Sequence, residues 1–264
     1  MATSEYLTST DIRVGWIRAQ SGAIVPINYA NVDGWAVFEG CILLGKTEEM
    51  DYVAGRISNA PDIVTNEDLN LLGLAITNPG QKWPKVGDFY EVAYEMAPDL
   101  PNSDLAKSAI KHWEANTKIR FKPRGSASAW VSFVRGLGPA SSVGRQGGQQ
   151  FILLSSNSTE GNAIHEIGHT VGLWHEHSRP DRDDFIDVRP QNINPATRFN
   201  FDKQTYNAAP VGPYDFGSIM HYPDWAFSIN NQPTIRPKPN PPPEIGQRRA
   251  LSPGDIATIA ALYP

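Results

Sequence analysis

The sequence predicts an α+β fold in which strands and helices fill the middle of the chain and largely irregular structure follows them. Apolar residues alternate through "DFYEVAYEM", as in a half-buried strand, and a capped helical pattern comes next. Four of the six histidines fall within thirteen residues, from His165 to His177, with helical spacing at their start. Regular patterning thins after residue 175 and returns only at the end of the chain.

Length and composition narrow the class of protein. A chain of 264 residues holds one large domain, or one domain with a substantial appendage. The net charge of -5 is mild, no Lys/Arg cluster suggests nucleic acid, and no apolar stretch reaches the length of a membrane span. We therefore expect neither a nucleic-acid nor a membrane partner. The first residues lack the pattern of a signal peptide, so either the protein stays inside the cell or its signal is absent from this chain.

The segment before about residue 74 contains short apolar pieces, "GAIVPINY" and "GWAVFEGCILLG", which indicate isolated strands rather than a domain core. The first long elements follow. Asn102 or Ser103 is expected to cap a helix within "PNSDLAKSAIKHWEANT". The apolar stripe of that helix consists of Leu105, Ala109, Ile110 and Trp113.

Three strand-like pieces come next, "KIRF", "AWVSFV" and "QFILLS". The glycine-rich "GLGPASSVGRQGGQ" between the last two predicts an exposed loop and an edge strand. Further on, "QPTIRPKPNPPPE" indicates an extended or polyproline segment. The chain closes with a short helix in "SPGDIATIAALY", with Ser252 as its cap, Pro253 at its first position and Asp255 in its first turn.

The histidine cluster has the spacing of a metal site. His165 and His169 are four residues apart, so on a helix both rings leave one face and can meet a single ion. Glu166 is placed to reach a water on that ion. Gly172 can end the helix in a left-handed conformation and turn the chain so that His175 returns as a third ligand. Three ligands leave one position of a tetrahedral zinc open, as in catalytic sites.

Two simpler interpretations compete with a catalytic site. A helix with surface histidines does not account for the added glycine and third histidine. A closed structural zinc site would leave Glu166 without a role and usually recruits cysteine. The sequence therefore predicts one catalytic Zn²⁺ held by His165, His169 and His175.

At this point the chain resembles a known family. "HEIGHTVGLWH" is similar to the extended zinc motif of the metzincin peptidases, and "SIMHY" is similar to their Met-turn, with Met220 as an apolar floor below the metal. Glu176, directly after the third histidine, and Tyr222, two residues after the methionine, point to the astacin family. The resemblance runs from about residue 75 to residue 264 and includes "KWP", "TKIRF" and "LSPGDIATIAALY".

The chain departs from the astacin pattern in its cysteines. Astacins generally carry two disulfides in this domain, whereas no cysteine follows Cys41 here. Pro139 and Ala140 stand where a cysteine and an aromatic residue often precede the "SSVGR" strand. This pattern suggests a bacterial branch similar to myroilysin, with a domain held together by core packing alone.

The resemblance implies a two-lobed metzincin fold and a zinc-dependent endopeptidase. The upper lobe is a twisted, mostly parallel sheet with an antiparallel edge strand and two helices, and the lower lobe is irregular and ends in a helix. Protein or peptide substrates lie extended along the edge strand near "SSVGRQ". Glu166 acts as general base and then acid. Tyr222 is implied to be an additional zinc ligand that swings away to hydrogen-bond the oxyanion, the alternative being a packed aromatic.

The resemblance also divides the chain into an inhibitory pro-segment, residues 1–74, and a catalytic domain, residues 75–264. Astacin pro-segments place the aspartate of an F-x-G-D motif on the zinc. Here "FEGC" puts Cys41 at that position, and a thiolate is a strong zinc ligand. The alternative is a free cysteine buried in the "CILL" strand. Ile76 and Trp83 have the family's spacing, which predicts a mature N-terminus near Gly73, Leu74 or Ala75. Its ammonium would be held by Glu176.

The remaining expectations concern partners and the other histidines. The resemblance implies a secreted monomer that is activated by another protease or by itself. Two rival functions stay open: a catalytically silent zinc protein that binds peptides, and a zinc hydrolase of non-peptide substrates. His177 and His221 are expected at the surface or behind the metal ligands, and His112 is expected to be structural.

Overall fold

The computed structural model describes residues 5–19, 23–59, 81–205 and 209–264. The expected maturation region around Gly73, Leu74 and Ala75 lies outside the described residues, as does the expected boundary between pro-segment and catalytic domain.

The central sheet is built on four mutually parallel strands. Strand β6 (Phe89–Met96) pairs in parallel with β7 (Ile119–Pro123) and β8 (Trp130–Arg135), and β8 pairs in parallel with β10 (Gln149–Leu154). Two short strands run antiparallel to these, β5 (Lys85–Val86) beside β6 and β9 (Ala140–Ser141) beside β10. The mostly parallel sheet with an antiparallel outer strand is confirmed.

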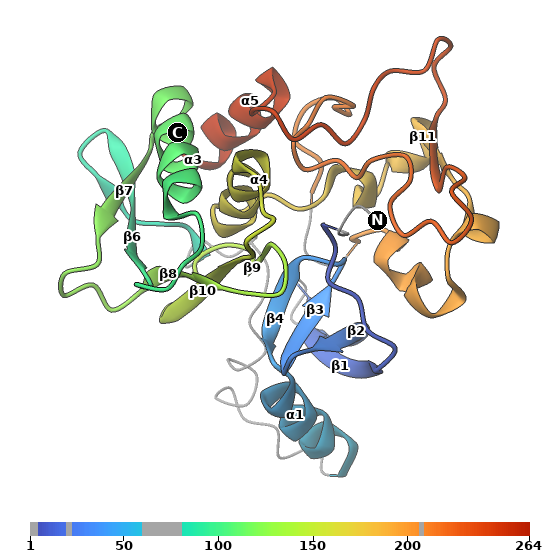
Figure 1. Ribbon diagram of the computed structural model, residues 1–264, viewed down its shortest axis with the longest axis horizontal. Helices are drawn as coiled ribbons and strands as arrows, with labels where there is room; N and C mark the ends of the chain where they lie inside the picture. The colour runs from blue at the N-terminus through green and yellow to red at the C-terminus, as the bar shows by residue number, and fades with distance from the viewer. Residues whose placement is uncertain (1–4, 20–22, 60–80, 206–208) are drawn as a thin grey trace.

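Two helices pack together on one side of this sheet, α3 (Ser103–Asn116) and α4 (Glu160–Thr170), as Figure 1 shows. Trp113 of α3 is completely buried between them, and its indole Nε1 donates to the carbonyl oxygen of Ile164 at 3.0 Å. The predicted capping of α3 is wrong in detail, because Asn102 lies at the N-cap in a left-handed conformation and its side chain donates instead to the Ser156 carbonyl.

The N-terminal segment forms an antiparallel meander that extends the same sheet. Strands β1 (Ile12–Arg18), β2 (Ile24–Val32), β3 (Trp35–Phe38) and β4 (Ile42–Lys46) pair in order, and β4 then pairs in parallel with β9. The expectation of isolated strands is therefore wrong. Helix α1 (Thr47–Asn59), which the sequence analysis did not predict, packs on the meander through a cluster that includes Tyr29, Phe38, Met50 and Val53. Figure 1 shows this part in blue, below the end of α4.

The chain after α4 is largely irregular, as expected. It contains short 3-10 helices and one two-stranded antiparallel sheet, namely η3 (Glu176–Ser178), η4 (Arg182–Asp184), β11 (Ile186–Val188), η5 (Pro190–Asn192), η6 (Pro195–Phe201) and β12 (Ile235–Pro237). Helix α5 (Pro253–Leu262) begins as predicted, because the Ser252 hydroxyl accepts a hydrogen bond from the Asp255 N–H at 2.9 Å. None of the helices in the described parts of the chain is both long and apolar enough to cross a lipid bilayer.

Candidate active site

Helix α4 carries the first two histidines. Thr159 caps it, and Thr159 and Asn162 exchange hydrogen bonds between side chain and backbone in a capping box. His165 and His169 project from one face, one turn apart, with ring centroids separated by 4.8 Å. Gly172, with a φ of 117°, turns the chain after the helix as predicted, and its N–H donates to the His169 carbonyl. The turn brings the ring of His175 to within 5.3 Å of His165 and 4.7 Å of His169.

Cys41 lies at the centre of these rings. Its Sγ is 3.6 Å from Nε2 of His165, 3.5 Å from Nε2 of His169 and 3.2 Å from Nε2 of His175. The four donor atoms all lie within 4.8 Å of one another, and all four residues are buried. Three imidazoles and one thiol form a donor set that suits zinc in number and in softness. The residues therefore fit the metal that the sequence predicts.

The protonation of the histidines also fits a metal site. The Nδ1 atom of His165 is 2.8 Å from the carbonyl oxygen of Ile219, and that of His169 is 2.8 Å from the carbonyl oxygen of Leu173. Each Nδ1 therefore donates its proton and leaves the Nε2 lone pair for a metal. Burial lowers the pKa of each of the three histidines, that of His169 to about 4, so the rings are neutral at physiological pH.

Glu166 follows His165 directly in α4 and is almost completely buried. Among the described residues, no group hydrogen-bonds its Oε2 atom. Burial raises the pKa of Glu166 well above its usual range. A carboxylate with a free oxygen and a raised pKa beside a metal site can accept a proton and return it.

Tyr222 is fully buried, and its hydroxyl donates to the carbonyl oxygen of Glu39 at 2.5 Å. Its ring stacks on His177 with centroids 3.6 Å apart and lies 4.8 Å from the ring of His175. Met220 is buried, and its sulfur packs so closely on Gly168 that a Cβ at this glycine would lie 2.6 Å from it. A glycine between the two helical histidines therefore leaves room for the methionine.

Residues 75–264 match the profile of the peptidase family described as Astacin. The chain belongs to the astacin family. Its three histidines form the zinc site typical of astacins, and the Cys41 thiol faces that site.

Individual relatives agree with this assignment. Blastula protease 10 of Paracentrotus lividus is 41% identical over 196 residues, which cover 69% of this chain and 32% of that protein. The solved structure of High choriolytic enzyme 1, a hatching enzyme zinc-protease from Oryzias latipes, is 33% identical with a TM-score of 0.67, and the match covers 72% of this chain and 98% of that one. The chain spans only 28% to 38% of the length of the first three curated relatives it matches.

The comparisons favour animal astacins over the myroilysin-type branch that the cysteine pattern suggested. The solved structure of myroilysin is 22% identical with a TM-score of 0.52, and the match covers 70% of this chain and 97% of that one. At this identity the likeness to myroilysin concerns the fold alone, whereas Blastula protease 10 is 41% identical to this chain.

The other histidines of this astacin are structural. His177 and His221 are both fully buried, so the expectation that they lie at the surface is wrong, and the alternative position behind the ligands holds for His177, which stacks on Tyr222. His221 accepts from the Tyr214 hydroxyl at 2.7 Å and donates to the Tyr222 carbonyl at 2.6 Å. His112 accepts a hydrogen bond from the Leu251 N–H at 3.1 Å, as a structural histidine does.

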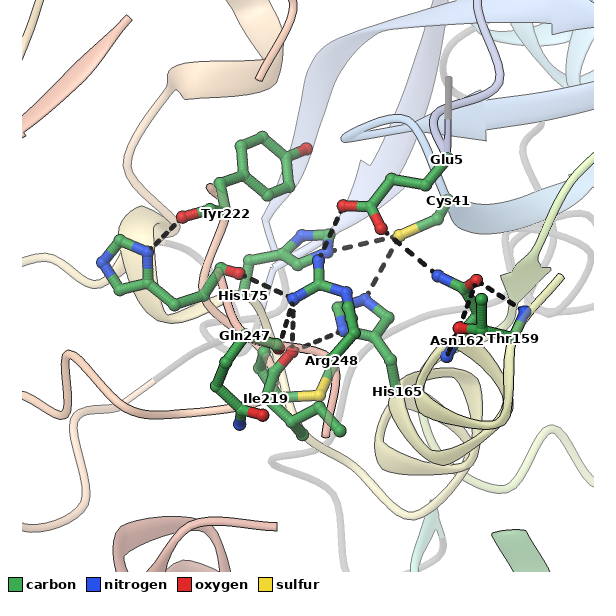
Figure 2. Close-up of polar contacts among 12 residues, drawn as sticks. Glu5, Cys41, Thr159, Asn162, His165, His175, Ile219, Tyr222, Gln247 and Arg248 are labelled. Carbon is green, nitrogen blue, oxygen red and sulfur yellow. Dashed lines mark hydrogen bonds and ion pairs between the residues drawn. The ribbon is translucent and has the colours of Figure 1, made fainter. Parts of the chain in front are cut away.

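Sequence analysis missed a second contact between the N-terminal segment and the site. Figure 2 shows the Arg248 guanidinium between Glu5 and the carbonyl oxygen of Ile219, beside Cys41 and His165. Arg248 Nη2 lies 3.1 Å from Glu5 Oε1, and Asn162 Nδ2 donates to Glu5 Oε2 at 3.2 Å. Glu5 and Arg248 are 243 positions apart, so no local pattern could reveal this pair.

Glu176 faces a cavity of about 300 Å³. Its Oε1 accepts from Arg179 Nη1 at 3.1 Å and from the Asp215 N–H at 2.8 Å. Burial raises the pKa of Glu176 to about 7. The cavity is also lined by Lys82, Leu173, Met220, Asp255 and Leu262.

Strand β4 of the N-terminal segment occupies the edge where substrate was expected. β9 pairs with β10 on one side and with β4 on the other, and the Ser141 N–H donates to the Cys41 carbonyl at 2.8 Å. The predicted edge strand is therefore not free in this form of the chain.

Proposed function

We propose that this protein is the latent form of a zinc-dependent endopeptidase. The observation that carries the proposal is the donor set, in which Cys41 Sγ and Nε2 of His165, His169 and His175 lie within 4.8 Å of one another beside the buried carboxylate of Glu166. Membership of the astacin family supports hydrolysis of peptide bonds over the two rival functions.

The roles proposed for the side chains follow from their chemistry. Bound zinc supplies a Lewis acid that acidifies a coordinated water and polarises a carbonyl. Glu166 accepts the proton of the attacking water and delivers it to the leaving amine. Tyr222, once released from the Glu39 carbonyl, donates a hydrogen bond to the developing oxyanion.

Latency is proposed to depend on residues 1–74, with residues 75–264 as the catalytic domain. The Cys41 sulfur takes the position that the water needs, and β4 covers the edge of β9. After cleavage, the cavity beside Glu176 offers a place for the new N-terminal ammonium, whose charge would replace part of the interaction with Arg179.

The partners are proposed by family resemblance: protein or peptide substrates, and an activating protease that is either another enzyme or the protein itself. On the same ground we propose a secreted monomer.

The test is zinc content and casein hydrolysis before and after limited proteolysis. No Lys or Arg lies between Arg56 and Lys82, so trypsin cannot cut near residue 75. Pancreatic elastase cuts after small apolar residues and can afterwards be blocked with a serine-protease inhibitor. We expect about one zinc per chain throughout, and activity only after a cut that N-terminal sequencing places near Gly73 to Ala75. Zinc-free protein, or processed protein with zinc but without peptidase activity, would contradict the proposal.

A further inference from the structure

The three histidines differ in what holds their second nitrogen. Nδ1 of His165 and of His169 donates to backbone carbonyls, those of Ile219 and Leu173. Both carbonyls belong to the proposed catalytic domain. Nδ1 of His175 instead lies 2.5 Å from the Glu39 carboxylate, which belongs to the proposed pro-segment. The third histidine thus depends on a residue that maturation removes.

Glu39 is held firmly in this position. It is completely buried, and its other oxygen, Oε1, accepts from Gln204 Nε2 at 2.9 Å. Its φ is 45°, in the left-handed region that residues other than glycine rarely adopt, within the turn between β3 and β4. A buried carboxylate with a partner on each oxygen, held in an uncommon backbone conformation, indicates a specific role.

The chemistry of imidazole identifies that role. A neutral ring offers a lone pair at Nε2 only if its proton is on Nδ1, and a carboxylate on Nδ1–H fixes that tautomer, orients the ring and increases its basicity. We propose that Glu39 is a positioning residue that prepares His175 as a zinc ligand in the latent form. The inference rests on the proposed zinc site and adds a second task to the pro-segment, which both blocks the metal site and supports it.

The consequence concerns zinc retention before and after maturation. Glu39 and Cys41 are two residues apart, so both leave when the pro-segment leaves. The hydrogen bond from His175 Nδ1–H to Glu39, strengthened by the charge of the carboxylate, is then lost. The latent chain should therefore bind zinc more tightly than the mature enzyme. The difference in zinc affinity should be larger than the loss of the Cys41 thiol alone explains.

The test compares the zinc affinity of intact chains by competition with a chromogenic chelator. Glu39→Gln preserves shape: its amide oxygen can accept from His175 Nδ1–H, and the Gln204 amide can turn over to face the new NH₂ group. Mutation of the outer hydrogen-bond partner of a metal-binding histidine typically weakens metal binding by about 10- to 100-fold, and we expect a loss in this range because the negative charge is gone. Glu48→Gln, at an exposed position of α1, is the matched control and should bind like wild type.

Three further measurements separate the possible outcomes. Zinc affinity should fall by the same factor from Cys41→Ser to Cys41→Ser/Glu39→Gln as from wild type to Glu39→Gln. The thiol is absent from both members of the first pair, so it cannot account for that fall. In ¹⁵N-histidine-labelled protein, the Nδ1–H resonance of His175 should shift in Glu39→Gln. If Glu39→Gln does not fold, Glu39→Asp, which retains the charge, should show a smaller loss of the same kind. Wild-type protein without zinc would overturn the proposed function, whereas equal zinc affinity in wild type and Glu39→Gln would overturn only the role of Glu39.

Discussion

Replacing Glu5 by glutamine removes one charge from the ion pair that ties the start of the proposed pro-segment to the catalytic domain. Glu5 Oε1 and Arg248 Nη2 are 3.1 Å apart, and the two side chains are only 20% and 13% exposed. At an effective dielectric constant of about 20, two unit charges at this distance attract by about 5 kcal/mol. Desolvation offsets much of that attraction, so the net worth of a charge-assisted hydrogen bond is about 1.5–3 kcal/mol.

Loss of the ion pair between Glu5 and Arg248 should weaken latency rather than lower the global stability of the chain. Arg248 Nη1 still donates to the carbonyl oxygens of Ile219, His221 and Gln247, each at 3.0 Å, so the catalytic domain keeps its contacts. The attachment of the proposed pro-segment to the catalytic domain weakens by this amount, although Tyr6 still packs against Tyr222 in the closed form. Since 1.4 kcal/mol is a factor of ten, the fraction of chains with an open site should rise by roughly 10- to 100-fold.

The assay measures hydrolysis of an internally quenched peptide by the intact chain, with serine-protease inhibitors present and gels to show that the chain stays uncut. The Glu5→Gln chain should hydrolyse the peptide faster than wild type and should match wild type once processed. Glu48→Gln serves as the control of equal charge change. One result would refute a role of the ion pair in latency: the Glu5→Gln chain is as latent as wild type, while the Cys41→Ala chain is active in the same assay.

Further outcomes follow from the same geometry. Cys41→Ala should relieve latency and lower zinc affinity in the intact chain; a variant that stays latent would reject the thiol block. Glu166→Gln, after processing, should lose about 10²–10⁴-fold in turnover while its zinc content, measured by elemental analysis, is unchanged. Tyr222→Phe should lose about 10²–10³-fold in kcat, and an unaffected kcat would assign the ring to packing. Burial lowers the pKa of His221 from 6.5 to about 4, so this residue's contribution to stability is complete above pH 6.5 and falls by about 3 kcal/mol towards pH 4. The free energy of unfolding of His221→Asn, measured with urea, should fall less between these pH values than that of wild type.

The features that the sequence predicted correctly have local signals. Two histidines four apart, Gly172 at the helix end and the Ser252–Asp255 capping box each act within one or two turns of the chain. Strand β6 was expected from its alternating apolar residues, and β8 and β10 from short apolar runs, whereas their parallel arrangement was implied by the family resemblance. These signals depend on the backbone geometry of neighbouring residues, so they can be read without knowledge of the fold.

The features that the sequence did not reveal depend on distant residues. Helix α1 has few buried positions, chiefly Met50 and Val53, and these face a cluster completed by β2 and β3. Glu39 meets His175 across 136 positions of sequence, in a turn that is followed by the pairing of β4 with β9. Burial of His177 likewise depends on Tyr222 and on the irregular segment around it. No periodicity within a segment encodes such contacts.

The turn between β3 and β4 accounts for how one segment can control several parts of the site together. Within four residues it supplies the carboxylate on His175, the carbonyl that holds the Tyr222 hydroxyl, the sulfur among the three imidazoles and the first residue of the strand beside β9. Phe38, just before these four residues, and Ile42, the last of them, are buried in one cluster with residues of the meander, α1, Val143 and Phe199, so the turn is held in place at both ends. A substitution removes one of these contacts and leaves the others in place, so single variants should be partly latent. Under the proposed maturation, release of residues 1–74 would remove all four contacts together, because residues 39–42 supply them.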